Sequence, residues 1–388
     1  MKSNSQIRGK RLIDDKPWVR IKKVTSDETV KIVDLFAGIG GFHYGVAAAA
    51  SKLNKGVEPL LVSELDPECQ TIYRNNHDCD VQGDINRISL RGEKDQADIV
   101  TAGFPCQPFS NSGLKLGLSD PRGQFYFKIV EIIKKYKARS FILENVAGIR
   151  TNGGGSYDSE LAITPQKIGK SMHVLEQNLK KLKGYHIQWL EIDSSDFGSP
   201  QVRKRVYIIG VEKRNHLKQF QLIFNDYKPK CFMDVVEDEF IDSLKLSKNQ
   251  EKNIRDFMKK KQPSFHDGMR RVGQAYTCPG GNVGQAYHAY GMVPTLTKVW
   301  ARFMPIYFPD QKTENYLDID SPDFKPNKNY GDGHIRRASV REAMRLQGFP
   351  DTFVPHPKDS IAYQHAGNAV NAKVVREIAE CIFAYLEL

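Results

Sequence analysis

The sequence has few cysteines, and none of them is spaced as a pair. Neither a Cys-x-x-Cys pair nor the regular ligand spacing of a zinc module occurs in the 388 residues. This argues against a disulfide framework and against a structural metal ion. We therefore expect no metal and a protein of the reducing cytosol. The six cysteines are Cys69, Cys79, Cys106, Cys231, Cys278 and Cys381.

Long apolar runs are absent as well. No stretch reaches the roughly 20 residues that a membrane-spanning helix needs. Residues 1–23 are polar and basic, without the apolar centre of a signal peptide. We therefore expect a soluble intracellular protein without membrane contacts. Residues 1–30 are interpreted as an N-terminal extension, either an arm that touches phosphates or, more commonly, a solvated tail.

Acidic residues are outnumbered by basic ones. Lysine and arginine together number 57 against 46 aspartates and glutamates, which gives a formal charge of +11. This balance favours a polyanionic partner such as nucleic acid, although the same charge can serve solubility alone. With 40% hydrophobic residues, a chain of this length can bury one large core or two modest ones. We expect two lobes.

Short apolar runs alternate with helical segments over residues 31–210. The strand-like runs lie at residues 31–36, 60–64, 98–102, 141–143, 186–192 and 205–210, and helical segments lie at 125–135 and 172–183. Such alternation predicts an α/β fold with a doubly wound, mostly parallel sheet. The alternation is lost over residues 211–335, which indicates a second, smaller and irregular domain. A helical pattern returns at residues 336–388, and this segment is predicted to complete the first domain.

One cysteine lies in a turn directly after a predicted strand. The stretch from Gly103 to Gly113 reads GFPCQPFSNSG and places Cys106 between two prolines. Ligands of α/β sheets bind where strands end, so Cys106 is a candidate nucleophile. A lone cysteine is more often a buried packing residue. The neighbouring motifs decide between these interpretations.

Four motifs in sequence order carry a resemblance to a known family. They are FAGIGG at residues 36–41, the Cys106 stretch, ENV at residues 144–146 and QVRKR at residues 201–205. Together they resemble the cytosine-C5 DNA methyltransferases of bacterial restriction–modification systems. The match covers residues 31–210 and resumes from Arg336 to the C-terminus. It implies a Rossmann-like methyltransferase fold with a target-recognition domain at residues 211–335.

The glycine turn is the first part of the implied cofactor site. An apolar strand that ends in a glycine turn lets backbone amides approach a ligand, and an acidic residue after the next strand can bind a ribose. This pattern alone suits a dinucleotide equally well. The resemblance assigns it to S-adenosylmethionine and implies ten contact residues. They are Phe36, Ala37, Gly38, Gly40, Glu64, Asp84, Ile85, Pro105, Asn368 and Val370.

Methylation of cytosine C5 needs a nucleophile, because C5 alone does not attack a sulfonium methyl group. A thiolate that adds at C6 leaves negative charge toward N3, which a carboxylic acid beside N3 can stabilise. The resemblance makes Cys106 the nucleophile and Glu144 the acid, with a surface or capping carboxylate as the alternative for Glu144. It also gives Arg205 the contact to cytosine O2 and Arg203 the support of the Cys106 loop, with a plain surface ion pair as their alternative.

The reacting cytosine has to leave the duplex, because C5 and C6 cannot be reached within stacked bases. The resemblance therefore implies double-stranded DNA as the substrate of a monomer, without a stable complex with the cognate endonuclease. Two alternatives remain open, the tRNA-methylating branch of the family and a catalytically silent DNA-binding relative. The implied substrate-binding residues are Gln107, Ser110, Arg122, Asn145 and Thr295, the last in a Thr-Leu motif.

Overall fold

The computed structural model describes nine segments of the chain. They are residues 29–105, 124–213, 220–228, 230–237, 242–260, 275–277, 285–297, 304–308 and 333–388. Four of the predicted site residues, Cys106, Gln107, Ser110 and Arg122, lie outside them. Every helix within these segments is too short or too polar to cross a membrane.

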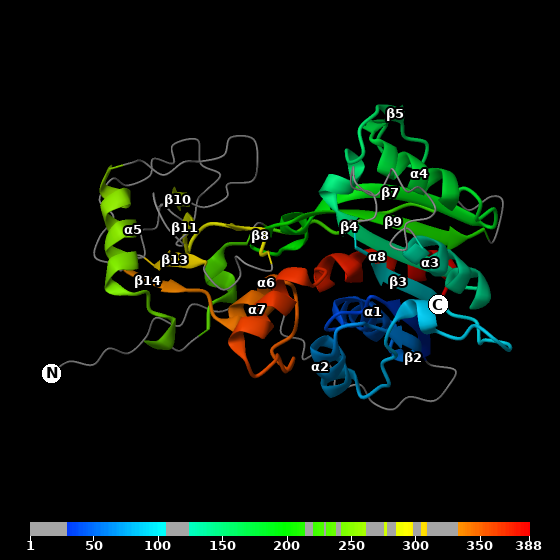
Figure 1. Cartoon of the computed structure of the whole chain (residues 1–388), viewed down its shortest axis with the longest axis horizontal. Coiled ribbons are helices and arrows are strands. Elements are labelled where there is room, and N and C mark those ends of the chain that lie inside the picture. The colour runs from blue at the N-terminus through cyan, green and yellow to red at the C-terminus, as the bar shows by residue number, and fades with distance from the viewer. Residues whose placement is uncertain are drawn as a thin grey trace.

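A six-stranded sheet forms the centre of the larger lobe (Figure 1). In sheet order its strands are β2 (Gly56–Ser63), β1 (Thr29–Leu35), β3 (Ile99–Gly103), β4 (Ser140–Val146), β9 (Lys204–Glu212) and β7 (Tyr185–Asp193). Pairing is parallel from β2 to β4, whereas β9 is antiparallel to both of its neighbours. Five strands therefore run in one direction, and the predicted α/β fold with a mostly parallel sheet is confirmed.

Helices connect the strands; some of them cover the central sheet, and others pack with the smaller lobe. They are α1 (Gly41–Lys52), α2 (Pro67–His77), α3 (Gln124–Lys135), α4 (Lys170–Leu179), α5 (Lys248–Lys260), α6 (Val340–Leu346), α7 (Asp359–Asn368) and α8 (Ala372–Leu386). Single 3₁₀ turns lie at Ile85–Arg87, Ala147–Arg150, Ser194–Phe197, Phe232–Val235 and Asp242–Leu244. The short strands are β5 (Tyr157–Asp158) with β6 (Lys167–Ile168), and β8 (Gln201–Val202) with β12 (Val293–Pro294).

Side chains of the central strands alternate between the two faces of the sheet. From β1, Val33 and Leu35 pack in the cluster that contains α3 and α4. Val30 and Ile32 pack in the cluster that contains α1 and α8. Because both faces are covered, the strands appear in the sequence as apolar runs rather than as alternating patterns.

The last helix of the chain packs against the first. In Figure 1, α8 (red) and α1 (blue) lie close together at the large sheet. A Cβ on Gly45 would lie 2.5 Å from the Cβ of Val375, so the glycine allows the two helices to approach closely. Ile378 and Ile382 of α8 are fully buried in this contact.

The smaller lobe contains a four-stranded sheet, in the order β10 (Ala275–Thr277), β11 (Gln285–His288), β13 (Pro305–Phe308) and β14 (His334–Arg337). These strands are three or four residues long, which is too short for a recognisable alternation, so the sequence predicted an irregular domain. Tyr287 and Ile306 share a core cluster with Met344 of α6 and Tyr363 of α7. Accordingly, α6 and α7 lie between the two lobes in Figure 1.

Residues 220–228 lie on the larger lobe. Phe220 is buried in the cluster of α1 and α8, and Leu222, Phe224 and Tyr227 pack against that cluster. This part of the predicted second domain therefore packs with the central sheet.

Candidate active site

The chain turns sharply after β1, and the backbone there favours glycine. Phe36, Gly38 and Gly40 have φ angles of 53°, 53° and 91°. Positive φ is unfavourable for residues that carry a Cβ. At Gly40 a Cβ would also lie 2.2 Å from Nε2 of His77, whereas at Gly38 it would meet no atom within 4 Å. Gly38 therefore leaves open space beside the turn.

Hydrogen bonds join this turn to the end of β2. The amide of Ala37 donates to the carbonyl of Ser63 at 3.0 Å. The amide of Gly38 donates to Oε2 of Glu64 at 2.8 Å, and Oε1 of Glu64 accepts from the amide of Asp66 at 2.8 Å. The glycine turn and the Glu64 carboxylate thus meet at the carboxyl ends of two parallel strands, the edge where α/β sheets bind their ligands.

Buried polar side chains lie beneath the glycine turn. Thr101 and Tyr73 donate hydrogen bonds of 2.7 and 3.1 Å to the carboxylate of Asp34, and burial raises the pKa of Asp34 to about 7. The Tyr73 hydroxyl lies 2.9 Å from Nδ1 of His43, whose ring stacks on His77 with 3.9 Å between centroids. Sequence reasoning missed this network, which packs against the turn through His77.

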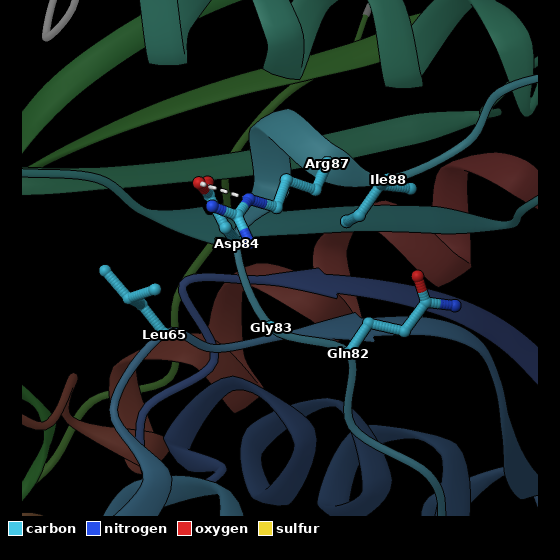
Figure 2. A pocket seen from close by; sticks show the side chains of 6 residues that line it. All are labelled: Leu65, Gln82, Gly83, Asp84, Arg87 and Ile88. Atoms are coloured by element: carbon cyan, nitrogen blue, oxygen red, sulfur yellow. Dashed lines mark ion pairs between the residues drawn. The ribbon is translucent and has the colours of Figure 1, made fainter.

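A cleft of about 360 Å³ lies beside these strand ends (Figure 2). The carboxylate of Asp84 accepts a hydrogen bond from the amide of Asn86 and lies 4.0 Å from Nε of Arg87. Sequence reasoning had selected only Asp84 from this cleft. The available signal for Leu65 was its position, directly after the predicted ribose-binding residue Glu64. In the structure, 69% of Leu65 is exposed. The lining residues are Leu65, Gln82, Gly83, Asp84, Arg87 and Ile88.

Two further predicted cofactor residues pack at the edge of the core. Ile85 is 3% exposed and belongs to the core cluster of α3 rather than to the lining of the cleft. The ring of Phe36 lies edge-on to that of Phe125, with 5.4 Å between centroids. Phe36 is half-buried, so part of its ring stays accessible beside the turn.

Glu144 lies near the end of β4, opposite the last residue of β3. It pairs in register with Gly103, and a Cβ on Gly103 would lie 3.7 Å from Oε2 of Glu144. Cys106 follows Gly103 by three residues. Oε1 of Glu144 lies 3.1 Å from Nε of Arg205, and only 13% and 14% of these two side chains are exposed. A paired carboxylate therefore lies close to the point where the Cys106 loop begins.

Burial controls the protonation of Glu144. It raises the pKa of this carboxyl group, while the charges of Arg205 and Arg203 partly oppose the shift. The group therefore holds a proton more readily than an ordinary glutamate, and Arg205 fixes its orientation. Both properties suit a side chain that donates a proton to a ring nitrogen.

Asn145 follows Glu144 and is 2% exposed. Its Nδ2 donates to the carbonyl of Phe104 at 2.8 Å, and its Oδ1 accepts from the amide of Val146 at 2.9 Å. The sequence predicted a substrate contact for Asn145, whereas both polar atoms of the buried amide contact backbone here. They hold the chain just before Pro105, which is exposed at the end of the described segment.

The guanidinium of Arg203 connects three parts of the chain. Nη1 donates to the carbonyl of Leu296 at 3.0 Å, and Nη2 donates to the carbonyls of Ala369 at 2.8 Å and Gly367 at 3.3 Å. The residue is 3% exposed, and burial together with the charge of Arg205 lowers its pKa to about 10. The sequence predicted that Arg203 supports the Cys106 loop. That loop lies outside the described residues, and the contacts of Arg203 within them go to the smaller lobe and to the C-terminal segment.

The Thr-Leu motif lies against the strand that precedes Arg203. Strand β12 pairs in parallel with β8, and the hydroxyl of Thr295 donates to the carbonyl of Val202 at 2.8 Å. The motif was predicted to bind substrate; the structure shows that it joins the smaller lobe to the segment that leads into β9.

The C-terminal segment passes beside the glycine turn. A Cβ on Gly41 would lie 2.8 Å from Cγ1 of Val370 and 3.0 Å from its carbonyl oxygen. Val370 is 8% exposed, and Asn368 is exposed at the end of α7. Residues that lie more than three hundred positions apart in the chain therefore pack together beside the glycine turn.

The chain matches known proteins over most of its length. The family model of the C-5 cytosine-specific DNA methylases matches residues 30–384. The Type II methyltransferase M.HaeII of Haemophilus aegyptius is 32% identical and aligns with 90% of this chain and 91% of its own. The Type II methyltransferase M.HgiCI of Herpetosiphon aurantiacus is 28% identical, over 92% of this chain and 99% of its own. The structure of the Entamoeba histolytica methyltransferase EhMeth shows the same fold, with a TM-score of 0.62 and 17% identity over 92% of this chain and 99% of its own.

The mostly parallel sheet has the fold of that solved methyltransferase, and the family match makes the class that of an S-adenosylmethionine-dependent methyltransferase. The chain belongs to the family of C-5 cytosine-specific DNA methylases. It is therefore an enzyme that methylates cytosine C5 in DNA, and the activity and cofactor predicted from the sequence are confirmed.

The residues at the cleft fit the adenosine part of S-adenosylmethionine. A Cβ on Gly38 or Gly83 would meet no atom within 4 Å, so space is left beside both backbones. Glu64 and Asp84 present carboxylates, which accept hydrogen bonds from ribose hydroxyls or from an exocyclic amine. Leu65 lines the cleft with an exposed apolar side chain, against which an adenine ring could pack.

We predict that Leu65→Ala weakens binding of S-adenosylmethionine about 5- to 30-fold, because about 1–2 kcal/mol of apolar contact is lost. Stability should change little, since Leu65 is mostly exposed. Calorimetric titration measures the affinity. Leu53→Ala, which removes an exposed leucine at the end of α1, is the matched control. Equal affinities of the two variants would contradict the role of Leu65.

Proposed function

We propose that the chain is the modification enzyme of a Type II restriction–modification system. In this proposal it acts as a monomer on a short, specific duplex site in the bacterial cytoplasm, without a stable complex with the endonuclease. The similarity to the Type II methyltransferases M.HgiCI and M.HaeII supports this role. The catalytic assignment depends above all on one observation, the buried Glu144–Arg205 pair beside the start of the Cys106 loop.

In the proposed reaction, the thiolate of Cys106 forms a bond to C6 of the flipped cytosine. The electron pair of the C5–C6 double bond moves into the ring, and Glu144 donates its proton to N3. S-adenosylmethionine would supply the methyl group that C5 accepts, with S-adenosylhomocysteine as the leaving group. A base, which can be a water molecule, removes the C5 proton. The Cys106–C6 bond then breaks, and N3 returns its proton to Glu144.

The two arginines are given different roles. Arg205 orients the Glu144 carboxyl group and presents a second edge of its guanidinium to cytosine O2. Arg203 is a positioning residue, because its two terminal nitrogens donate to three backbone carbonyls. It keeps the smaller lobe and the C-terminal segment in place around the site.

The cofactor and the DNA are assigned to opposite sides of this pair. The cofactor contacts proposed from the described geometry are Gly38, Glu64, Leu65 and Asp84. DNA lies between the lobes, where Gln107, Ser110 and Arg122 contact the flipped nucleotide and the smaller lobe reads the sequence. Because residues 220–228 pack on the larger lobe, we place the start of the target-recognition domain after Tyr227.

The nucleophile is tested by trapping. Duplex DNA with 5-fluorocytosine at the target should form a denaturation-resistant adduct with the enzyme in the presence of S-adenosylmethionine, because no C5 proton can leave. Cys106→Ser should form none, and the control Cys79→Ser, which removes a half-buried free thiol, should trap normally. The adduct is detected by its mass shift.

The same experiment separates the alternatives. Trapping on tRNA but not on duplex DNA would support the tRNA-methylating branch. A protein that binds the duplex without trapping it would be a silent relative. An undiminished adduct in Cys106→Ser would move the nucleophile to another residue.

The acid is tested by its pH dependence. Glu144→Gln should slow methyl transfer about 10²- to 10⁴-fold, because the amide cannot give up a proton to N3. In the wild type, the contribution of Glu144 falls as the pH rises through the raised pKa of its carboxyl group, and this limb of the rate profile should vanish in the variant. Glu131→Gln, on the exposed side of α3, is the control. A Glu144→Gln profile that keeps this limb would contradict the assignment.

A further inference from the structure

Three potential metal ligands meet where α2 begins and α7 ends. An oxygen of Asp66, Sγ of Cys69 and a ring nitrogen of His365 all lie within 4.8 Å of one another. Asp66 caps α2 and Cys69 lies in its first turn, whereas His365 comes from the C-terminal segment. The cluster is separate from the catalytic pair, and it lies close in sequence to Glu64 and Asn368 at the two sides of the cofactor site.

The histidine of this cluster lacks a protein partner for one of its nitrogens. His365 is 5% exposed, and its Nδ1 is buried without a hydrogen bond. Buried polar atoms are nearly always satisfied, so an orphaned ring nitrogen needs an explanation. Burial also lowers the pKa of His365, which favours the neutral imidazole that binds metal ions.

The charges around the cluster favour a cation. The carboxylates of Glu64, Asp66 and Glu68 lie near enough to Cys69 to act on its thiol, so the cluster is surrounded by negative charge. Oδ1 of Asp66 accepts from the amide of Glu68, which leaves Oδ2 available. The remaining neighbour, His356, lies 3.1 Å from Glu68 through Nε2.

We propose that Asp66, Cys69 and His365 bind a divalent ion of the zinc type, with water as the fourth ligand. One thiolate, one imidazole and one carboxylate form a donor set that suits tetrahedral Zn²⁺ or Co²⁺, whereas Mg²⁺ and Ca²⁺ prefer oxygen alone. On binding, the thiol proton of Cys69 passes to solvent and the sulfur forms a bond to the metal.

Such an ion would link α2 to α7. These helices carry or adjoin the residues on both sides of the cofactor site, so the metal would stiffen the site without taking part in the reaction. No local motif indicated this site, because Asp66 and Cys69 form only a local pair and the third ligand comes from the far end of the chain. The expectation of no metal rested on local spacing alone.

Cobalt provides the direct test, because a thiolate bound to Co²⁺ gives a charge-transfer absorption band in the near ultraviolet. The full-length protein, treated with EDTA and then titrated with Co²⁺, should develop this band with a stoichiometry of one, and Zn²⁺ should displace it. Cys69→Ser should lose the band. His365→Gln should weaken Co²⁺ binding about tenfold or more, equivalent to at least about 1.4 kcal/mol.

Matched thiol variants identify the sulfur. Cys106→Ser and Cys79→Ser should keep the band, because neither thiol belongs to the cluster. Circular dichroism verifies that each variant is folded, and His365→Gln tests the site independently should Cys69→Ser fail to fold. Absence of the band in the wild type, its persistence in Cys69→Ser, or unchanged affinity in His365→Gln would overturn the proposal.

Discussion

The buried guanidinium of Arg203 is the contact on which the assembly of the site depends. A buried charge is tolerated only where hydrogen bonds replace water, and Arg203 finds them at the carbonyls of Leu296, Gly367 and Ala369. One acceptor belongs to the smaller lobe and two belong to the C-terminal segment. Displacing either segment would therefore leave part of a buried cation unsatisfied.

Through this contact, one stretch of backbone organises both sides of the reaction. Before Arg203, β8 pairs with β12, and the carbonyl of Val202 in β8 accepts a hydrogen bond from the hydroxyl of Thr295. After it, β9 carries Arg205 to the carboxylate of Glu144. Arg203 also binds the carbonyl of Ala369, and the next residue, Val370, packs against the start of α1 at the glycine turn. The smaller lobe, the Glu144 carboxylate and the glycine turn are thus linked through a few residues around Arg203.

Features with local signals could be predicted from the sequence. The strands of the central sheet are apolar runs, and Gly38 and Glu64 follow the ends of two of them, so their meeting at one edge was expected, whereas Asp84 was selected from the family resemblance alone. The reversed direction of β9, the short strands of the smaller lobe and the packing of residues 220–228 depend on tertiary contacts. The backbone contacts of Asn145 and the Asp66–Cys69–His365 cluster were likewise invisible, because each joins segments that lie far apart in the chain.

The claim that Arg203 holds the smaller lobe and the C-terminal segment around the site is tested most directly by hydrogen exchange of the Arg203→Met variant. Arg203→Lys is the milder change, and Arg150→Met, which removes a more exposed ion pair, is the control. In Arg203→Met we predict faster exchange at residues 291–297 and 365–371, unchanged exchange in β1 and β3, and cofactor binding weaker by about 5- to 100-fold, since buried carbonyls lose their donor. The lysine variant should lie between these values and the wild type. Unchanged exchange in both segments, with normal cofactor affinity, would contradict the account.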